Sequence, residues 1–362
     1  MKILVDLSGC ITHSSITVYA KRLLSGWIEN NYTDIIVLCS SEIYSDIKNS
    51  FPTYSCVKFE NKCKFIKNCL QWRIQTKDID YDLILIPHAE PYNALLGKGK
   101  KVMIFHDLQG LRVRKGMCLW KTWLRYPMAL IRSHRIITIS HFVEKDILKT
   151  YPFVSDQKLE TIYNGIKIET IADNTVPIPQ KYLLYVSVLK EYKNLITLIK
   201  AFNILKNDIT HQLVIIGIPT PYWNETIVPY IEGNGLQERI IHISHRVDDQ
   251  TLSQYYQHAS LFVHPSLHEG FGYTPIEAAI HEVPVLSSKA TALYETTLGL
   301  LNYYEPTTDE KAMAKQIKHI LQNPPSPRQL AEISKVFQKR YNNKQQAEKI
   351  YNYLKNIYQQ AL

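Results

Sequence analysis

The sequence predicts an α/β protein made of two doubly wound domains that face one another across a cleft. Short runs rich in Val and Ile alternate with helical patterns, as expected for parallel strands buried on both faces. The alternation stops in residues 169–180, which contain two prolines and no periodicity, and then starts again. Two successive βα series joined by a linker therefore favour two domains, each with a ligand site at the carboxyl ends of its strands.

The first domain is predicted to span residues 1–168 and the second residues 181–340, with the linker at 169–180 between them. The expected strands of the first domain are residues 2–7, 33–40, 81–87, 101–108 and 135–140. Those of the second are residues 181–189, 211–217, 239–244, 260–266 and 283–288. Residues 341–362 carry an apolar face at helical spacing, and we expect this helix to pack back toward the N-terminal domain.

Length and composition agree with two globular domains. The chain has 362 residues, of which 45% are hydrophobic and 21% charged. Its first residues, "MKILVDLSG", have a short apolar run that stops at Asp6, unlike a signal peptide. No apolar stretch approaches the roughly 20 residues that a membrane span requires. We therefore expect a cytoplasmic protein.

Cysteine content and charge limit the chemistry further. The six cysteines lie in the first third of the chain without any CxxC pair, which favours reduced thiols over disulfides or a zinc site. The net charge of +9 would attract a nucleotide diphosphate, an anionic lipid or a nucleic acid. Nucleic acid is disfavoured, because the charge is dispersed and no nucleic-acid-binding signature appears.

The stretch "HEGFGYTPIEAAI", after the strand at 260–266, carries the clearest candidate site. Gly270 and Gly272 allow a sharp turn and a close approach of the backbone to a ligand. Thr274 is predicted to cap the next helix, with Glu277 completing a capping box. The amino end of that helix would favour a phosphate. The capping box alone explains Glu277, whereas Glu269 is either an exposed loop acid or a ligand-binding carboxylate.

Two histidines next to this loop, His264 and His268, are four residues apart. Pro265 argues against a helix across them, and no third ligand is evident, so no metal site is predicted.

Glu269 and Glu277, with seven residues between them, resemble the EX7E signature of the retaining glycosyltransferases of family 4, which have the GT-B fold of two Rossmann-like domains. The segments "YLLYVSVLKEYKNLITLIKAF", "LVIIG", "VDDQTLSQYYQHASLFVHPS", "VMIFHDL", "ISHFVEKDIL" and "IYNGI" are similar to family segments in the same order. The resemblance therefore extends over nearly the whole chain.

The resemblance implies a role for each matching residue. Glu277 would hold the ribose hydroxyls of a nucleotide sugar. Glu269 would bind hydroxyls of the transferred sugar, aided by the backbone amides of Gly270, Phe271 and Gly272. A carboxylate suits this task because it accepts several hydroxyl hydrogen bonds.

The diphosphate would be held by Lys193, which matches the family's phosphate-binding lysine, and by the helix at Thr274, without a metal or another cofactor. Ser187 is also expected among the donor contacts. Many relatives carry an arginine near this lysine, where this chain has other residues, and Arg246 is the candidate substitute.

His106, at the end of a predicted strand, matches the family's cleft histidine on the acceptor side; a satisfied core histidine is the alternative. The implied mechanism is front-face displacement with retention, in which the leaving phosphate helps to deprotonate the acceptor. His106, Glu269 and Lys193 are thus the predicted catalytic residues.

The resemblance implies transfer of a hexose or deoxyhexose from a GDP-, UDP- or dTDP-sugar to a glycan or lipid-linked acceptor, in bacterial surface polysaccharide synthesis. A nucleotide-sugar epimerase of the same fold and a non-catalytic sugar- or nucleotide-binding relative are the alternatives. Residues 112–135 mix Trp with Lys and Arg, so they either contact the inner face of the cytoplasmic membrane or cover their own domain.

Overall fold

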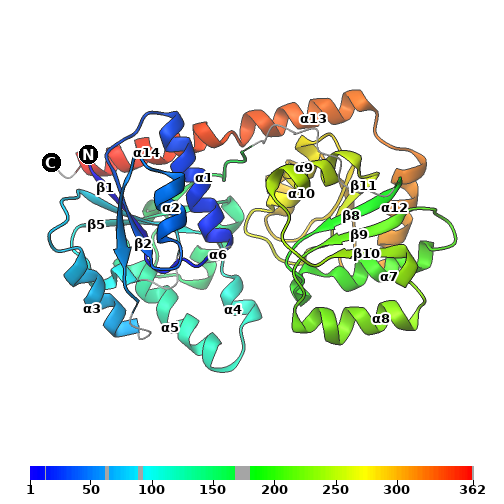
Figure 1. The fold of residues 1–362 in the computed structure, drawn as a ribbon, viewed down its shortest axis with the longest axis horizontal. Coiled ribbons are helices and arrows are strands. Elements are labelled where there is room, and N and C mark those ends of the chain that lie inside the picture. Colours follow the sequence, from blue (N-terminus) through cyan, green and yellow to red (C-terminus); the bar gives the residue numbers. More distant parts are fainter. Residues whose placement is uncertain (13, 62–64, 89–92, 168–179, 361–362) are drawn as a thin grey trace. The chain divides into compact units, whose positions relative to one another are not determined.

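The computed structural model describes residues 1–362 except 13, 62–64, 89–92, 168–179 and 361–362. The chain divides into two compact units, Met1–Lys167 together with Tyr341–Leu362, and Ile168–Arg340 (Figure 1). Each unit contains one parallel sheet with helices packed around it, which confirms the α/β prediction. All of the predicted linker except Gln180 lies outside the described residues.

The sheet of the first unit has seven parallel strands in the order β3-β2-β1-β4-β5-β6-β7. They are β1 (Ile3–Leu7), β2 (Ile35–Ser40), β3 (Ser55–Phe59), β4 (Leu83–Ile86), β5 (Lys100–Phe105), β6 (Arg135–Thr138) and β7 (Leu159–Thr161). The five predicted strands are confirmed. The sequence missed β3 and β7 at the two edges, because β3 is largely solvent-accessible and β7 has only three residues.

The helical segments of this unit connect successive strands. They are α1 (Ser15–Glu29), α2 (Tyr44–Ser50), α3 (Phe65–Gln75), η1 (Asn93–Leu96), α4 (Gln109–Val113), α5 (Gly116–Arg132), α6 (His141–Thr150) and η2 (Asp156–Lys158). Helix α1 begins at Ser15, and the side chain of Ser14 caps it by accepting a hydrogen bond from the backbone N–H of Thr17.

The last helix, α14 (Asn343–Gln359), packs against α1 within the first unit. The two backbones approach closely at Gly26, where a Cβ would lie 2.6 Å from Cβ of Ala347. The indole of Trp27 donates to the carbonyl of Ala347 at 2.9 Å, and the ring of Tyr351 stacks on that of Tyr32. The apolar face of the tail is therefore covered by α1.

The sheet of the second unit has six parallel strands in the order β10-β9-β8-β11-β12-β13. They are β8 (Tyr182–Val186), β9 (Gln212–Ile216), β10 (Ile240–Ile243), β11 (Leu261–His264), β12 (Val285–Ser288) and β13 (Asn302–Tyr304). Five of these are predicted from the sequence. The short edge strand β13 is not, since its three residues are mostly only partly buried.

The helical segments of the second unit are η3 (Glu191–Lys193), α7 (Leu195–Leu205), η4 (Trp223–Ile227), α8 (Val228–Gly233), η5 (Gln237–Arg239), α9 (Asp249–His258), α10 (Tyr273–Ile280), α11 (Leu293–Thr296), α12 (Glu310–Gln322) and α13 (Pro327–Arg340). In the described part of the chain, no helix is long and apolar enough to cross a bilayer.

The strand orders fix where ligands are expected. The direction of chain progression reverses between β1 and β4 in the first sheet, and between β8 and β11 in the second. Doubly wound sheets bind ligands at such reversal points, beyond the carboxyl ends of the strands. The loops after β8 and β11 are therefore the natural walls of a site in the second unit.

Candidate active site

The loops after β8 and β11 carry most of the predicted donor-site residues. The two strands pair in parallel, with Leu183 opposite Leu261, so both loops leave the same edge of the sheet. Lys193 ends the short segment η3 that follows β8. Glu269 lies in the loop between β11 and α10. The strand order thus brings together Lys193 and Glu269, which are 76 positions apart in the sequence.

Direct hydrogen bonds tie the two loops together. The backbone N–H of Leu267 donates to the carbonyl of Tyr192 at 2.9 Å. The side-chain amide of Asn194, a residue in the left-handed region with φ of 57°, donates to the carbonyl of Pro265 at 3.2 Å. These bonds fix the position of Lys193 relative to the loop that carries Glu269.

The carboxylate of Glu269 is the centre of the cluster. Its Oε1 lies 2.6 Å from Nζ of Lys193 and 3.0 Å from Nε2 of His264, and the Lys193 and Glu269 side chains are each only 13% exposed. Burial by itself would raise the pKa of Glu269, but the charge of Lys193 and the hydrogen bonds outweigh it and hold this pKa far below its usual range. The carboxylate is therefore ionised at neutral pH.

His264, the last residue of β11, is buried and bridges Glu269 to α10. Its Nδ1 lies 3.2 Å from Oγ1 of Thr274. Burial lowers the pKa of His264 despite the adjacent carboxylate. A neutral ring fits these contacts, because Nε2–H then donates to Glu269 and Nδ1 accepts from the Thr274 hydroxyl.

This role of His264 was not predicted from the sequence, in which the residue was a candidate metal ligand only. No group of three or more His, Cys, Asp or Glu side chains suited to a metal occurs among the residues that the structure describes. The signal that could have found the role is a histidine at the carboxyl end of a buried strand, five residues before the predicted sugar-binding glutamate.

The predicted capping box is wrong. Helix α10 begins at Tyr273, and its cap is Gly272 in the left-handed region with φ of 87°, without a side-chain cap. Thr274 already lies inside the helix, with its hydroxyl toward His264, and Glu277 is half-buried one turn further on. A left-handed glycine ends the loop two residues before the threonine, so Thr274 is not at the cap position.

The loop before α10 is held by hydrogen bonds to the hydroxyls of Thr291 and Thr296. Gly270 and Phe271 are buried, and the carbonyl of Phe271 accepts a hydrogen bond from the Thr296 hydroxyl at 2.6 Å. The backbone N–H of Glu269 donates to Oγ1 of Thr291 at 2.8 Å. These contacts hold the loop backbone in the conformation that directs Glu269 toward Lys193.

Of the two remaining predicted donor contacts, Ser187 begins the loop after β8, and Arg246 lies in a loop further along the same sheet. Ser187 follows β8 directly, and its backbone N–H donates to the carbonyl of Ile216 at 3.2 Å. Arg246 is exposed in the loop between β10 and α9, and β9 and β8 separate β10 from β11. The cluster itself therefore consists of Lys193, Glu269, His264 and Thr274.

In the first unit, the predicted His106 follows β5. Its Nε2 lies 2.9 Å from the carbonyl oxygen of Pro87, and its ring meets that of Tyr19 edge-on at 4.8 Å. Burial lowers the pKa of His106 to about 4, so the ring is neutral at pH 7. Asp107, next to it, accepts a hydrogen bond from the backbone N–H of Gln109.

A buried polar group at the β1 and β4 ends was not predicted from the sequence. Nε2 of His88 lies 3.2 Å from the carbonyl oxygen of Asp6, whose carboxylate accepts from the N–H of Ser8 at 3.0 Å. The amide of Asn93 donates to Oγ of Ser8. The signal was available, because His88 in "IPHAEP" and His106 in "IFHDL" each follow one of two neighbouring strands.

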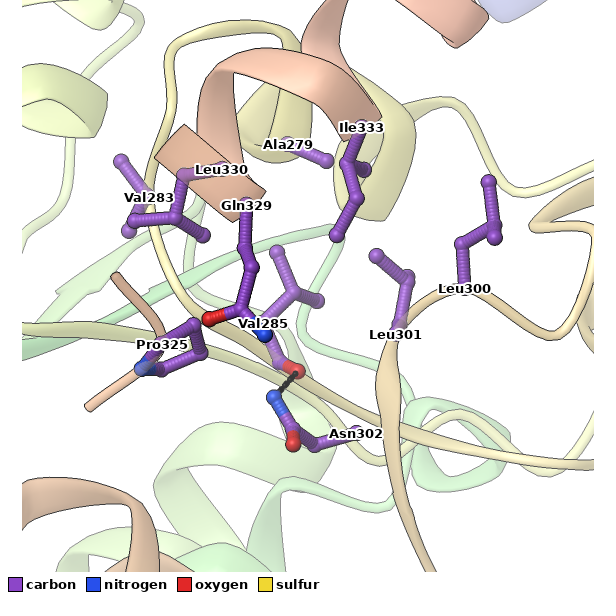
Figure 2. Close-up of a pocket in the computed structure, with 10 residues that line it drawn as sticks. All are labelled: Ala279, Val283, Val285, Leu300, Leu301, Asn302, Pro325, Gln329, Leu330 and Ile333. Atoms are coloured by element: carbon purple, nitrogen blue, oxygen red, sulfur yellow. Dashed lines mark hydrogen bonds between the residues drawn. The ribbon is translucent and has the colours of Figure 1, made fainter. Parts of the chain in front are cut away.

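A cavity of about 180 Å³ lies in the second unit among α10, β12, β13 and α13 (Figure 2). Aliphatic side chains form most of its wall, together with two amides, Asn302 and Gln329, and Asn302 donates to the carbonyl of Val285. Its lining includes Ala279 near the carboxyl end of α10 but none of the predicted site residues. This cavity is therefore distinct from the Lys193–Glu269 cluster.

Two family models match this chain. Residues 16–170 match the family model described as Glycosyltransferase Family 4, and residues 167–337 match the model described as Glycosyl transferases group 1. Together the two models cover residues 16–337, which include every described strand except β1 and the segments that carry Lys193, Glu269 and Glu277.

Among curated proteins, the chain is 28% identical over 206 residues to the O-antigen chain mannosyltransferase RfbU of Salmonella typhimurium. The match covers 56% of this chain and 56% of that protein, so the chain spans about half the length of this relative.

Solved structures share the fold at low sequence identity. The sucrose-phosphate synthase of Thermosynechococcus elongatus superimposes with a TM-score of 0.80 at 17% identity, covering 99% of both chains. Anabaena HepE in complex with UDP-glucose superimposes with a TM-score of 0.77 at 16% identity, covering 98% of this chain and 100% of that one.

Proposed function

We propose, since this chain belongs to the family 4-like glycosyltransferases of the GT-B fold, that it transfers a hexose or deoxyhexose from a nucleotide-diphosphate sugar to a glycan or lipid-linked acceptor with retention of configuration. The observation that carries the proposal is the contact between Lys193 and Glu269 at the strand reversal point of the second unit. This pair offers one cation and one carboxylate from loops that are tied to each other.

The negative charge of Glu269 suits the sugar of such a donor, and the positive charge of Lys193 suits its diphosphate. An ionised carboxylate accepts hydrogen bonds from sugar hydroxyls. The ammonium of Lys193 can stabilise the negative charge that develops on a departing diphosphate. The positive end of the α10 helix dipole would add to that stabilisation without a metal. Glu277, one turn into α10, would hold the ribose.

The acceptor is assigned to the first unit. His106 is neutral at pH 7 and lies next to Pro87 at the carboxyl edge of β4 and β5. A neutral imidazole can hydrogen-bond a sugar hydroxyl as donor or acceptor. The departing phosphate, rather than a protein side chain, then helps to deprotonate the acceptor hydroxyl.

The relatives narrow the biological setting. The name of RfbU, an O-antigen chain mannosyltransferase, favours surface polysaccharide synthesis in a bacterial cytoplasm and a mannose-type donor for this chain. The HepE complex with UDP-glucose supports a nucleotide-sugar donor. A GDP-, UDP- or dTDP-sugar is therefore the proposed substrate class, with a glycan or a lipid-linked saccharide as acceptor.

Nucleoside diphosphate release distinguishes this proposal from its rivals. The protein is incubated with GDP-mannose, UDP-glucose or dTDP-rhamnose, with and without a panel of octyl glycosides, and products are identified by mass spectrometry. A transferase produces an octyl disaccharide and the diphosphate in equal amounts. An epimerase converts the donor without an acceptor, and a non-catalytic relative leaves every donor unchanged.

Chelation tests the proposal that sugar transfer needs no metal ion. Activity in excess EDTA should equal activity without it, because Lys193 and the α10 amino end take the place of a cation. Loss of activity in EDTA that returns with Mg²⁺ or Mn²⁺ would overturn this part of the proposal.

A further inference from the structure

We propose that the cavity among α10, β12, β13 and α13 is a binding site for a small, uncharged amphiphile. The ligand class is an alcohol or a phenol, with one hydroxyl group on a hydrocarbon body of about six carbon atoms. The inference goes beyond the proposed function, because the residues that line this cavity include none of the Lys193–Glu269 cluster. It concerns the second unit alone.

The volume of the cavity sets the size of the ligand. The cavity measures about 180 Å³. An engineered apolar cavity of about 150 Å³ in another protein is large enough to bind benzene. A six-membered ring with one substituent therefore fits, whereas a nucleotide or a disaccharide is too large.

The wall of the cavity favours a hydrocarbon body. Ala279, Val283 and Val285 line its buried side, and each is at most 2% exposed. Figure 2 shows Ile333 of α13 and Leu301, from the loop before β13, extending toward one another. Burial of a ligand's carbon atoms among these side chains is favourable, because it removes apolar surface from water.

The other side of the cavity is accessible from solvent. Leu300 is 39% exposed, and Gln329 at the start of α13 is exposed as well. A small molecule can therefore enter from solvent without unfolding of the second unit.

Two amides in the lining select the polar group of the ligand. Nδ2 of Asn302 donates to the carbonyl oxygen of Val285 at 3.2 Å, so Oδ1 is the atom left to accept a hydrogen bond. Oε1 of Gln329 accepts from the backbone N–H of Ser326 at 2.9 Å, so Nε2 is left to donate one. A hydroxyl group suits either amide, because it both donates and accepts.

The charge of the lining disfavours an ionised ligand. All ten lining residues are uncharged. Transfer of a carboxylate or an ammonium group from water to such surroundings costs far more than transfer of a hydroxyl. A carboxylate would also repel Oδ1 of Asn302, and an ammonium would repel the Nε2–H group of Gln329. The ligand is therefore a neutral alcohol or phenol rather than an acid or an amine.

Helix α10 connects the cavity to the proposed donor site. It carries Glu277 and, two residues later, Ala279 in the cavity wall. The hydroxyl of Ser334 on α13 donates to the carbonyl of Ile280, the last residue of α10, at 2.7 Å. A ligand packed between α10 and α13 adds contacts that hold α10 in place. Because α10 is then ordered before a nucleotide binds, we expect nucleotide affinity to rise; this consequence rests on the proposed function.

Fluorine NMR of the full chain with 4-fluorophenol tests the binding site. Fluorobenzene, which lacks the hydroxyl, should bind about fivefold more weakly than 4-fluorophenol, and 4-fluorobenzoate should not bind measurably. Ala279→Leu fills part of the cavity, so it should abolish binding of 4-fluorophenol without lowering the melting temperature. The matched control Ala312→Leu, on α12 outside the lining, should bind as the wild type.

Two further variants make the test independent of Ala279. Ile333→Phe fills the cavity from α13 and should likewise abolish binding. Asn302→Val should weaken binding of 4-fluorophenol more than binding of fluorobenzene, because only the phenol loses a partner. The inference is overturned if 4-fluorophenol does not bind the wild type, if it binds both filled variants as tightly as the wild type, or if 4-fluorobenzoate binds equally well.

Calorimetric titration with GDP, UDP and dTDP tests the connection through α10. Saturating 4-fluorophenol should lower the Kd of the nucleotide that binds by about fivefold in the wild type and leave it unchanged in Ala279→Leu. An unchanged Kd in the wild type would overturn the connection. Binding of 4-fluorophenol to a protein that binds no nucleotide would contradict the proposed function and support the ligand site. Nucleotide binding without binding of 4-fluorophenol would do the reverse.

Discussion

Nζ of Lys193 lies 2.6 Å from Oε1 of Glu269, in a place where both side chains are largely removed from water. The two residues come from loops after neighbouring strands, so the contact depends on the order of the sheet rather than on sequence proximity. With each charge neutralising the other, the pair can be buried without the large cost of an isolated ion. The same charges are those that the proposed donor requires.

Lys193→Met should destabilise the protein by about 2 kcal/mol, because it leaves the Glu269 carboxylate buried without its cation. Urea unfolding measures the change. The double variant Lys193→Met with Glu269→Gln should recover most of that loss, since no buried charge remains, yet neither protein should transfer sugar. A double variant as unstable as the single one would show that the pair does not interact as described.

Acid should weaken folding through Glu269. Its pKa is lowered in the folded protein, so the stabilisation is complete above the unfolded pKa of about 4.3 and is lost as pH falls below it. The difference in unfolding free energy between wild type and Glu269→Gln should therefore shrink as the pH is lowered from 7 to 3.5. A difference that stays constant over this range would mean that the folded pKa is not lowered.

His264 should act by positioning Glu269. His264→Ala removes the Nε2–H donor at 3.0 Å and frees the carboxylate to turn, and we expect kcat to fall by about tenfold. His264→Gln can place an amide N–H near the same position and should recover part of the rate. His268→Ala, at a buried histidine outside the cluster, is the control. Equal rates for the Ala and Gln variants would argue that His264 only fills space.

Gly272 should tolerate no side chain. A Cβ there would lie 2.5 Å from Cδ2 of Leu293, in a residue with φ of 87°, and we expect Gly272→Ala to cost about 3 kcal/mol. Gly235 also has a positive φ, but no atom lies within 4 Å of its added Cβ. Gly235→Ala should therefore cost only the backbone strain, about 1 kcal/mol. Similar losses in the two variants would rule out the contact with Leu293.

The apolar pattern predicts the α/β class and ten of the strands, because parallel strands buried on both faces form continuous apolar runs. It fails at the edge strands β3, β7 and β13, which are short or partly exposed and need no such run. Edge strands form because a neighbouring strand offers its backbone, and this information is absent from their own side chains.

The charged residues of the site could be predicted from the sequence. The contacts that hold them in position could not. Glu269 is marked by its spacing to Glu277 and Lys193 by the family resemblance, but the bond from His264 depends on which way a strand-end side chain turns. The assumed capping box at Thr274 failed because the left-handed Gly272 starts the helix earlier.

The most direct test of the central claim is a thermal-shift panel of GDP, UDP, dTDP and ADP with their common sugar conjugates, on wild type, Glu269→Gln and Glu277→Ala. A ligand at about 100 times its Kd adds roughly 2.7 kcal/mol of stability, which raises the melting temperature measurably. We predict that one nucleotide family stabilises the wild type, that Glu277→Ala loses the shift for nucleotide and conjugate alike, and that Glu269→Gln loses only the extra shift from the sugar. Stabilisation of the wild type by none of these ligands, or equal shifts in all three proteins, would contradict a donor site at Lys193, Glu269 and Glu277.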